Sequence, residues 1–222
     1  MQLQYGQVAG YLPDFLIGAA LALVIAFAAF TMGMVIGLAG ASINAYGPRP
    51  ARIIVRAYVS FFTNTPQLVQ IFFLFFALPE LGVLLSPIQA VLIGMTLNAG
   101  AYLTEIQRAG FQSLPQAEIE AAETLGFTRL QTIRHVIAPH IVKALYPSLS
   151  NQYIIMTLGT SMAAIFGVEE LTARALNANA VSFRSIEIFT MTAVIYVLLT
   201  IAASALLYGL GRTLFRVKAR AF

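Results

Sequence analysis

A small set of amide and hydroxyl side chains stands out because the segments around it are almost wholly apolar. Its members are Thr65, Gln67, Gln70, Asn98, Thr157, Thr160 and Ser161. Polar groups are costly inside apolar helices, and that cost suggests a function. The hypothesis is that these side chains line one cavity through which a polar solute passes.

The spacing of the polar residues predicts how helices would present them. Thr63, Gln67 and Gln70 are four and three residues apart, which places them on one face of a continuous helix. For Gln67 and Asn98 we favour the cavity. For Ser150, Thr157 and Thr160 we favour a second interpretation, in which each hydroxyl bonds the backbone of its own helix.

Several kinds of catalysis are excluded by what the sequence contains. There is no cysteine, so thiolate zinc sites and a cysteine nucleophile are impossible. His135 and His140 are five residues apart with no third ligand nearby, so we interpret them as surface residues without a metal. The chain also lacks the glycine-rich phosphate loop of ATPases. We therefore expect no enzyme activity and no cofactor bound by this chain itself.

The composition points to a membrane protein. Hydrophobic residues make up 59% of the 222 positions and charged residues only 10%, against about 25% charged in a soluble domain. Five charge-free runs of 23 to 34 residues divide the chain. Each run is long enough for a helix that crosses the hydrocarbon core, which needs about 20 apolar residues. The prediction is an all-α integral membrane protein, one domain over residues 1–222, with spans at about 15–44, 57–78, 86–107, 144–166 and 187–211.

The basic residues predict the orientation of these spans. Eleven of the 13 Lys and Arg residues fall on one side of the membrane and two on the other. The positive-inside rule puts the eleven in the cytoplasm, with the N-terminus outside and the C-terminus inside. A basic cluster then anchors the C-terminal end at anionic headgroups; it consists of Arg212, Arg216, Lys218 and Arg220.

Small residues and a proline mark two spans as unusual. Gly33, Gly37 and Gly40 allow close helix approach, either within the subunit or against a second one. Pro66 removes a backbone hydrogen bond and predicts a kink or break in the second span.

The longest polar stretch, residues 112–140, predicts a helical hairpin on the cytoplasmic side. Pro115 can begin a first helix and Gly126 can end it. Thr128 is suited to cap a second helix, which we expect to end at Pro139. Glu118, Glu120 and Glu123 lie near the start of the first helix, where the helix dipole favours acidic side chains.

The same stretch resembles the EAA loop of bacterial ABC import permeases. The matching pattern is Glu120-Ala121-Ala122, three residues, Gly126, nine residues, then Val136-x-Ala138-Pro139. Val136 and Ala138 stand where the family has Ile and Leu. Further matching segments are Thr65–Gln70, Thr96–Arg108, Pro147–Asn151 and Thr160–Met162. Together they cover about residues 12–215 and are similar to the histidine, arginine and glutamine branch of the family.

The resemblance implies a fold, a role and a set of partners. The fold is that of type I ABC importer permeases, and the loop is a coupling helix that docks on an ATPase. The coupling residues would be Glu120, Ala121, Ala122, Gly126 and Pro139. Two ATP-binding cassette subunits would bind ATP and Mg²⁺, and a periplasmic binding protein would deliver a polar amino acid at the bacterial inner membrane. A second permease subunit and membrane lipid complete the expected partners; nucleic acid is not among them.

Two departures from the family pattern bear on the second subunit. Thr63 stands where the family has Arg, and Leu158-Gly159 stands where it often has Lys-Asp. Charges that could hold an amino-acid carboxylate are therefore missing. Either amides and backbone groups hold the substrate, or a non-identical permease subunit carries the charges, and we favour the second. The alternative function is an ion-coupled secondary transporter or channel. Such proteins need ionisable groups deep in the membrane, and Glu105 is almost the only one available.

Overall fold

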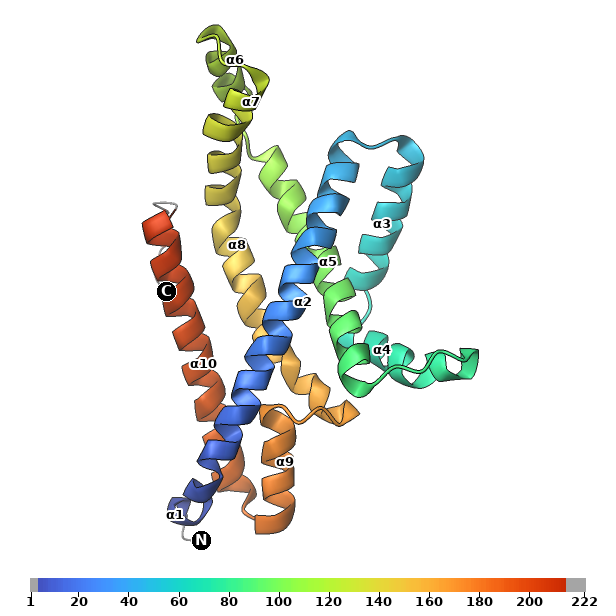
Figure 1. The fold of residues 1–222 in the computed structure, drawn as a ribbon, viewed down its shortest axis with the longest axis vertical. Coiled ribbons are helices and arrows are strands. Elements are labelled where there is room, and N and C mark those ends of the chain that lie inside the picture. The colour runs from blue at the N-terminus through green and yellow to red at the C-terminus, as the bar shows by residue number, and fades with distance from the viewer. Residues whose placement is uncertain (1–3, 215–222) are drawn as a thin grey trace.

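The computed structural model describes residues 4–214, and every secondary-structure element in that range is helical. The predicted anchor residues Arg216, Lys218 and Arg220 lie outside the described residues. Long helices cross one another along the length of the molecule (Figure 1). The α6–α7 hairpin stands at one end, and the N-terminal helix and α9 lie at the other.

The first span is one long helix that packs against the third. Helix α2 (Leu12–Tyr46) follows α1 (Tyr5–Val8) and the short turn η1 (Ala9–Tyr11), and it crosses α5 (Pro87–Gln112) closely. A Cβ atom on Gly33 would lie 2.8 Å from Ala99 Cβ, and one on Gly37 would lie 2.8 Å from Leu103 Cβ. The predicted small-residue face is thus used inside the subunit.

Replacing Gly37 with valine is expected to destabilise the protein by about 3 kcal/mol, because overpacking a tight helix crossing forces the two backbones apart. The clash would involve Leu103 backbone carbon, at 2.9 Å, which cannot rotate away. Thermal unfolding of the purified protein measures the effect. Gly209→Val in α10 is the matched control, since a Cβ atom there would meet nothing within 4 Å. Equal stability of the two variants would contradict the packing account.

The second span is broken at Pro66, as the proline predicts, and its first helix begins before residue 57. Helix α3 (Arg49–Thr63) ends before Pro66, and α4 (Gln67–Phe72) leaves at 104° to it. The turn of π-helix η2 (Phe73–Ala77) and the 3-10 turn η3 (Leu78–Leu81) continue α4. Pro66 adopts an extended backbone and caps α4. Thr63 and Gln67 therefore lie on two helices, and the predicted shared face does not exist.

The second arm of the hairpin and the fourth span form one nearly continuous helical rod, Arg129–Phe166. After α6 (Gln116–Thr124) come α7 (Arg129–Thr132), the π-helical turn η4 (Ile133–Ile137), α8 (Ala138–Gly159) and the 3-10 turn η5 (Thr160–Phe166). The prediction that a helix ends at Pro139 is wrong. Ala138 N–H bonds the Ile133 carbonyl, five residues back, so the π-turn absorbs the proline ring and Pro139 sits in the first turn of α8.

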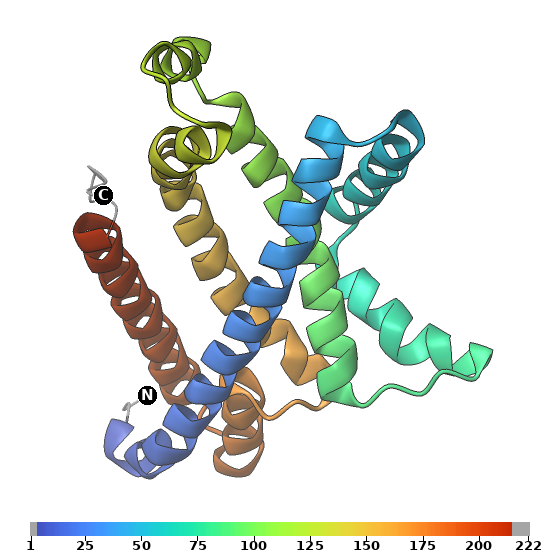
Figure 2. The same cartoon turned by 45° about the horizontal axis from the view of Figure 1, so that its top comes forward.

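The chain then turns by 49° into α9 (Leu171–Ser182) and ends in α10 (Ser185–Leu214), which runs back toward the hairpin end (Figure 2). By length and composition, two helical stretches of the described chain can cross a membrane, Tyr5–Tyr46 and Ser185–Thr213. The count rises to four if each bent pair is one span. Helix α5 is not among these stretches. Its buried residues include the polar Asn98 and Gln107.

Candidate functional site

The break in the second span is held by two buried amides. Gln70 of α4 and Asn98 of α5 are 7% and 8% exposed. The Gln70 Nε2 group donates to the Phe62 carbonyl at 3.0 Å and to the Thr65 carbonyl at 3.1 Å. Asn98 Nδ2 donates to the same Phe62 carbonyl at 3.2 Å and to Gln70 Oε1 at 3.1 Å. The amides thereby join the end of α3, the start of α4 and the middle of α5.

These bonds satisfy the backbone groups that the break sets free. A helix that stops inside a membrane leaves carbonyls without partners, and each must find another donor. The Thr65 hydroxyl adds two contacts, donating to the Phe61 carbonyl at 2.8 Å and lying 2.7 Å from Gln70 Nε2. Thr65, Gln70 and Asn98 are therefore brought together, as predicted for a common site, and their amide N–H groups are already engaged by the fold.

Gln67, the first residue of α4, lies next to the fourth span. Its side chain is half-buried and makes no hydrogen bond among the described residues. A Cβ atom built on Gly159, at the end of α8, would lie 3.7 Å from Gln67 Oε1. Gln67 thus offers a free amide beside Gly159, and half-buried Ser161 follows two residues later in the chain.

Thr157 and Thr160 are fully buried and face protein. The Thr157 hydroxyl donates to the Tyr153 carbonyl at 2.9 Å, and the Thr160 hydroxyl donates to the Thr157 carbonyl at 2.7 Å. This is the backbone-bonded arrangement favoured for these two residues from their types. The structure does not bring them to the amides of α4 and α5.

The turn between α6 and α7 is built on Gly126. Its φ of +78° lies in the left-handed region, where glycine has no steric penalty. Gly126 N–H donates to the Glu123 carbonyl at 2.9 Å, and Phe127 N–H donates to the Ala122 carbonyl at 3.0 Å. These two bonds are the Schellman motif that ends many helices. Gly126 therefore fixes the angle between the two arms of the hairpin.

The second arm is capped as predicted and tied to the base of the hairpin. Thr128 accepts from Gln131 N–H while Gln131 Oε1 accepts from Thr128 N–H, a complete capping box. His140 of α8 lies 3.2 Å from the Ser113 carbonyl and 3.4 Å from a Glu118 carboxylate oxygen. The histidine thus links the segment that enters the hairpin to the segment that leaves it.

The tip of the hairpin presents a polar and an apolar surface together. Glu120, Ala121 and Gly126 are exposed, whereas Ala122 is 2% exposed and packs inward. Leu125 and Leu130 are each 74% exposed on either side of the turn. The two leucines are five positions apart in the chain and flank the turn at the exposed end of the hairpin.

Comparison with known proteins identifies the chain. Residues 29–216 match the family described as binding-protein-dependent transport system inner membrane component. The chain belongs to this family. It is a permease of ABC transporters, whose ATP site lies on a separate subunit. The permease is 33% identical to the glutamine transport system permease protein of Escherichia coli (strain K12), over 96% of this chain and 98% of that one.

Other relatives extend the likeness to sequence and fold. The permease is 34% identical to the L-cystine transport system permease protein of Bacillus subtilis (strain 168), over 86% of this chain and 82% of that one. It superimposes on a crystal structure of an amino acid ABC transporter with histidines, with a TM-score of 0.88, 30% identity, and coverage of 96% and 100%. An inward-facing methionine transporter, MetNI, shares the fold at 18% identity and a TM-score of 0.65, over 88% and 95%.

Two tyrosines of the permease were not among the predicted site residues. The Tyr58 hydroxyl of α3 donates to the Leu97 carbonyl at 2.6 Å, and the Tyr102 hydroxyl reaches the Thr63 carbonyl at 3.5 Å. Both hydrogen bonds link α3 to α5 close to the break in the second span. Neither carbonyl partner is close in sequence to its tyrosine, so only the fold reveals the contacts.

Proposed function

We propose that this permease carries a polar amino acid across the bacterial inner membrane as part of an ATP-driven importer. The named relatives that cover most of the chain transport glutamine and L-cystine, and the similar crystal structure is of an amino acid ABC transporter with histidines. These likenesses favour ATP-driven import over the ion-coupled alternative. A periplasmic binding protein delivers the amino acid, and the surrounding lipid is a further partner.

The α6–α7 hairpin is the part through which ATP hydrolysis acts. The single observation that carries this assignment is the fixed turn at Gly126, which holds Glu120 and Ala121 exposed at one end of the molecule. Pro139 stands in the first turn of the rod below them. Two cassette subunits bind ATP and Mg²⁺, and their closure pushes the hairpin and tilts the α8 rod. Leu125 and Leu130 supply the apolar part of the contact.

We propose five spans, with the hairpin in the cytoplasm and the N-terminus outside. The spans are α2, the bent pair α3–α4, α5, α8 with η5, and α10. The absence of cysteine makes a direct test possible, since any introduced cysteine is the only one. Arg212→Cys near the end of α10, on the same predicted side as the hairpin, and Val181→Cys in α9 place it at exposed positions. A membrane-impermeant maleimide should label Val181→Cys in intact cells and Arg212→Cys only in permeabilised ones; the reverse pattern would refute the orientation.

The substrate pathway is proposed to run along the break in the second span. The side chains of Gln67 and Ser161 make no hydrogen bond among the described residues and can bind a solute. Thr65, Gln70 and Asn98 stabilise the adjoining helix break. Thr157 and Thr160 contribute to the wall of the fourth span rather than to binding. Glutamine and similar solutes match an amide side chain, which both donates and accepts hydrogen bonds.

A second, non-identical permease subunit is proposed to supply the charges that bind the amino-acid carboxylate. Thr63, Leu158 and Gly159 are uncharged where the family pattern has basic and acidic residues. The test expresses this chain with its ATPase and without other permease subunits. We expect no uptake from that pair. Full uptake would show that two copies of this chain suffice.

Purification in detergent tests the assembly as a whole. An affinity tag on this chain is expected to recover an ATP-binding cassette protein and a second permease, identified by mass spectrometry. Disruption of the hairpin surface by Leu125→Asp and Leu130→Asp should release the ATPase but keep the second permease. Retention of the ATPase by this double variant would contradict the proposed contact.

A further inference from the structure

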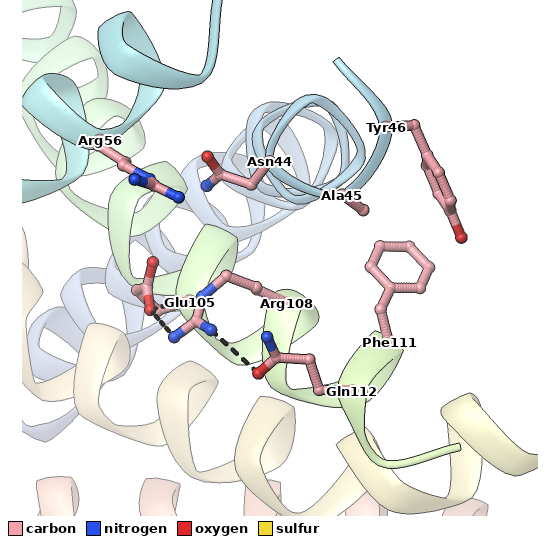
Figure 3. A pocket seen from close by; sticks show the side chains of 8 residues that line it. All are labelled: Asn44, Ala45, Tyr46, Arg56, Glu105, Arg108, Phe111 and Gln112. Atoms are coloured by element: carbon pink, nitrogen blue, oxygen red, sulfur yellow. Dashed lines mark hydrogen bonds and ion pairs between the residues drawn. The ribbon is translucent and has the colours of Figure 1, made fainter. Parts of the chain in front are cut away.

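A polar pocket of about 600 Å³ lies where α2, α3 and α5 meet near the hairpin end. Figure 3 shows Asn44 of α2 and Arg56 of α3 facing Glu105 and Arg108 of α5 across this space. None of these four residues was used in the proposed transport path. We infer that the pocket binds the phosphate-containing headgroup of an anionic phospholipid.

The charge of the pocket favours an anion. Arg108 is neutralised by Glu105, which accepts from its Nε at 3.0 Å and from its second terminal nitrogen at 2.6 Å. Arg56 makes no ion pair or hydrogen bond within the described part of the chain. Its guanidinium is therefore left as an unbalanced positive charge. A planar guanidinium binds phosphate oxygens through two parallel hydrogen bonds.

Arg56 belongs to a row of arginines on one face of α3. Arg49 and Arg52 precede it at spacings of seven and four residues, so all three share a face. Neither Arg49 nor Arg52 has an acidic partner among the described residues. The opposite face carries Ile54, which is 70% exposed. A helix with one basic and one apolar face is typical of the boundary between lipid headgroups and acyl chains.

The surroundings of the pocket favour a lipid headgroup over a free phosphate ion. Both ligands offer phosphate oxygens to Arg56. The apolar face of α3, which carries Ile54, and the exposed ring of Tyr46 would lie against acyl chains, which only a lipid provides. Phosphatidylglycerol, an anionic phospholipid, is therefore the expected ligand.

Aromatic rings complete the lining of the pocket. Tyr46 at the end of α2 is 83% exposed, and its ring meets Phe111 of α5 edge-on at a centroid distance of 6.5 Å. Tyrosine is enriched at the depth of the headgroups, where its ring is in lipid and its hydroxyl in water. The pocket also involves Gln112, which accepts from Arg108 at 3.0 Å and lies four residues before α6. A bound headgroup would therefore stiffen the base of the hairpin.

The experiment uses the complete transporter in nanodiscs of phosphatidylcholine, with and without phosphatidylglycerol. Lipid retained on the detergent-released complex is counted by native mass spectrometry. Arg56→Gln should lower phosphatidylglycerol retention about tenfold, as expected for loss of a charged hydrogen-bonding pair. Arg52→Gln on the same arginine row, outside the pocket lining, is the matched control and should retain the lipid. Arg56→Lys keeps the charge but lacks the planar guanidinium. Its phosphatidylglycerol retention should lie between those of Arg56→Gln and Arg52→Gln.

Three outcomes would overturn the inference. They are equal retention by Arg56→Gln and the unaltered protein, equal retention of phosphatidylcholine and phosphatidylglycerol, and displacement of the lipid by millimolar inorganic phosphate. The last result would assign the pocket to free phosphate. The inference rests on the proposed function only for the cytoplasmic placement of this end. Lipid retention is measured without transport. A failure of the lipid-binding inference can therefore be distinguished from a failure of the proposed transport function.

Discussion

Replacing Gly126 with valine is expected to lower amino-acid uptake at least about tenfold while the ATPase still hydrolyses ATP. A β-branched residue at φ +78° is strained by about 1–2 kcal/mol or more. The strain would be relieved by losing the bonds from Gly126 N–H to Glu123 and from Phe127 N–H to Ala122. The arms of the hairpin then change their angle, and closure of the ATPase no longer moves the spans. Uptake and phosphate release in proteoliposomes measure the two activities separately.

Gly126→Asn is the control that separates backbone conformation from side-chain size. Asparagine is larger than glycine but adopts the left-handed region far more readily than valine does. It should therefore preserve most of the uptake. If the asparagine and valine variants lost uptake equally, the surface at Gly126 would matter rather than its φ angle. If both kept full uptake, the hairpin would not be the coupling element.

Replacing Asn98 with leucine is expected to destabilise the transporter by about 2–4 kcal/mol, because the change leaves buried polar groups unpaired. Leucine would remove both bonds of Asn98 Nδ2, to the Phe62 carbonyl and to Gln70 Oε1. The break after α3 would then lose one of its two supports. The thermal unfolding midpoint of the assembled transporter in nanodiscs measures the loss.

A double-mutant cycle isolates the bond between the two amides. Asn98→Leu combined with Gln70→Leu should cost less than the sum of the single changes, since each single variant strands the other amide. Asn177→Leu in α9 is the control for the substitution itself, because Asn177 is exposed and makes no hydrogen bond among the described residues. Strict additivity would show that Asn98 and Gln70 act independently.

Local features of the fold were predictable because short-range chemistry dictates them. Pro66 has no N–H group to continue α3, and the span breaks there. Gly126 ends α6 in the left-handed region, and Thr128 caps α7, as their residue types indicate. The glycine row of α2 packs against another helix, and the structure adds that this helix is α5. The break at Pro66, the turn at Gly126 and the cap at Thr128 each depend on residues within about one helical turn, whereas the helix that meets the glycines could be identified only from the fold.

Two kinds of feature were not predictable in the same way. One is the rare π-turn: Pro139 was expected to end a helix, but a π-turn starting six residues earlier accommodates it. The other is a contact between distant residues. The partners of Gln70 and Asn98 lie up to 36 residues away and are partly backbone carbonyls, which carry no sequence signal. The predicted span 57–78 was bounded by the charges of Arg56 and Glu80, whereas α3 begins at Arg49. Arginine is a good helix former, so a charge does not mark the end of a helix.

The most direct test of the central claim is uptake by the complete transporter in proteoliposomes. A radiolabelled polar amino acid and its binding protein are placed on the side that corresponds to the periplasm, with ATP on the side of the α6–α7 hairpin. The account predicts uptake that requires hydrolysable ATP, stops with a non-hydrolysable analogue, and persists when proton and sodium gradients are dissipated. Uptake that continues without ATP and follows an ion gradient would contradict it.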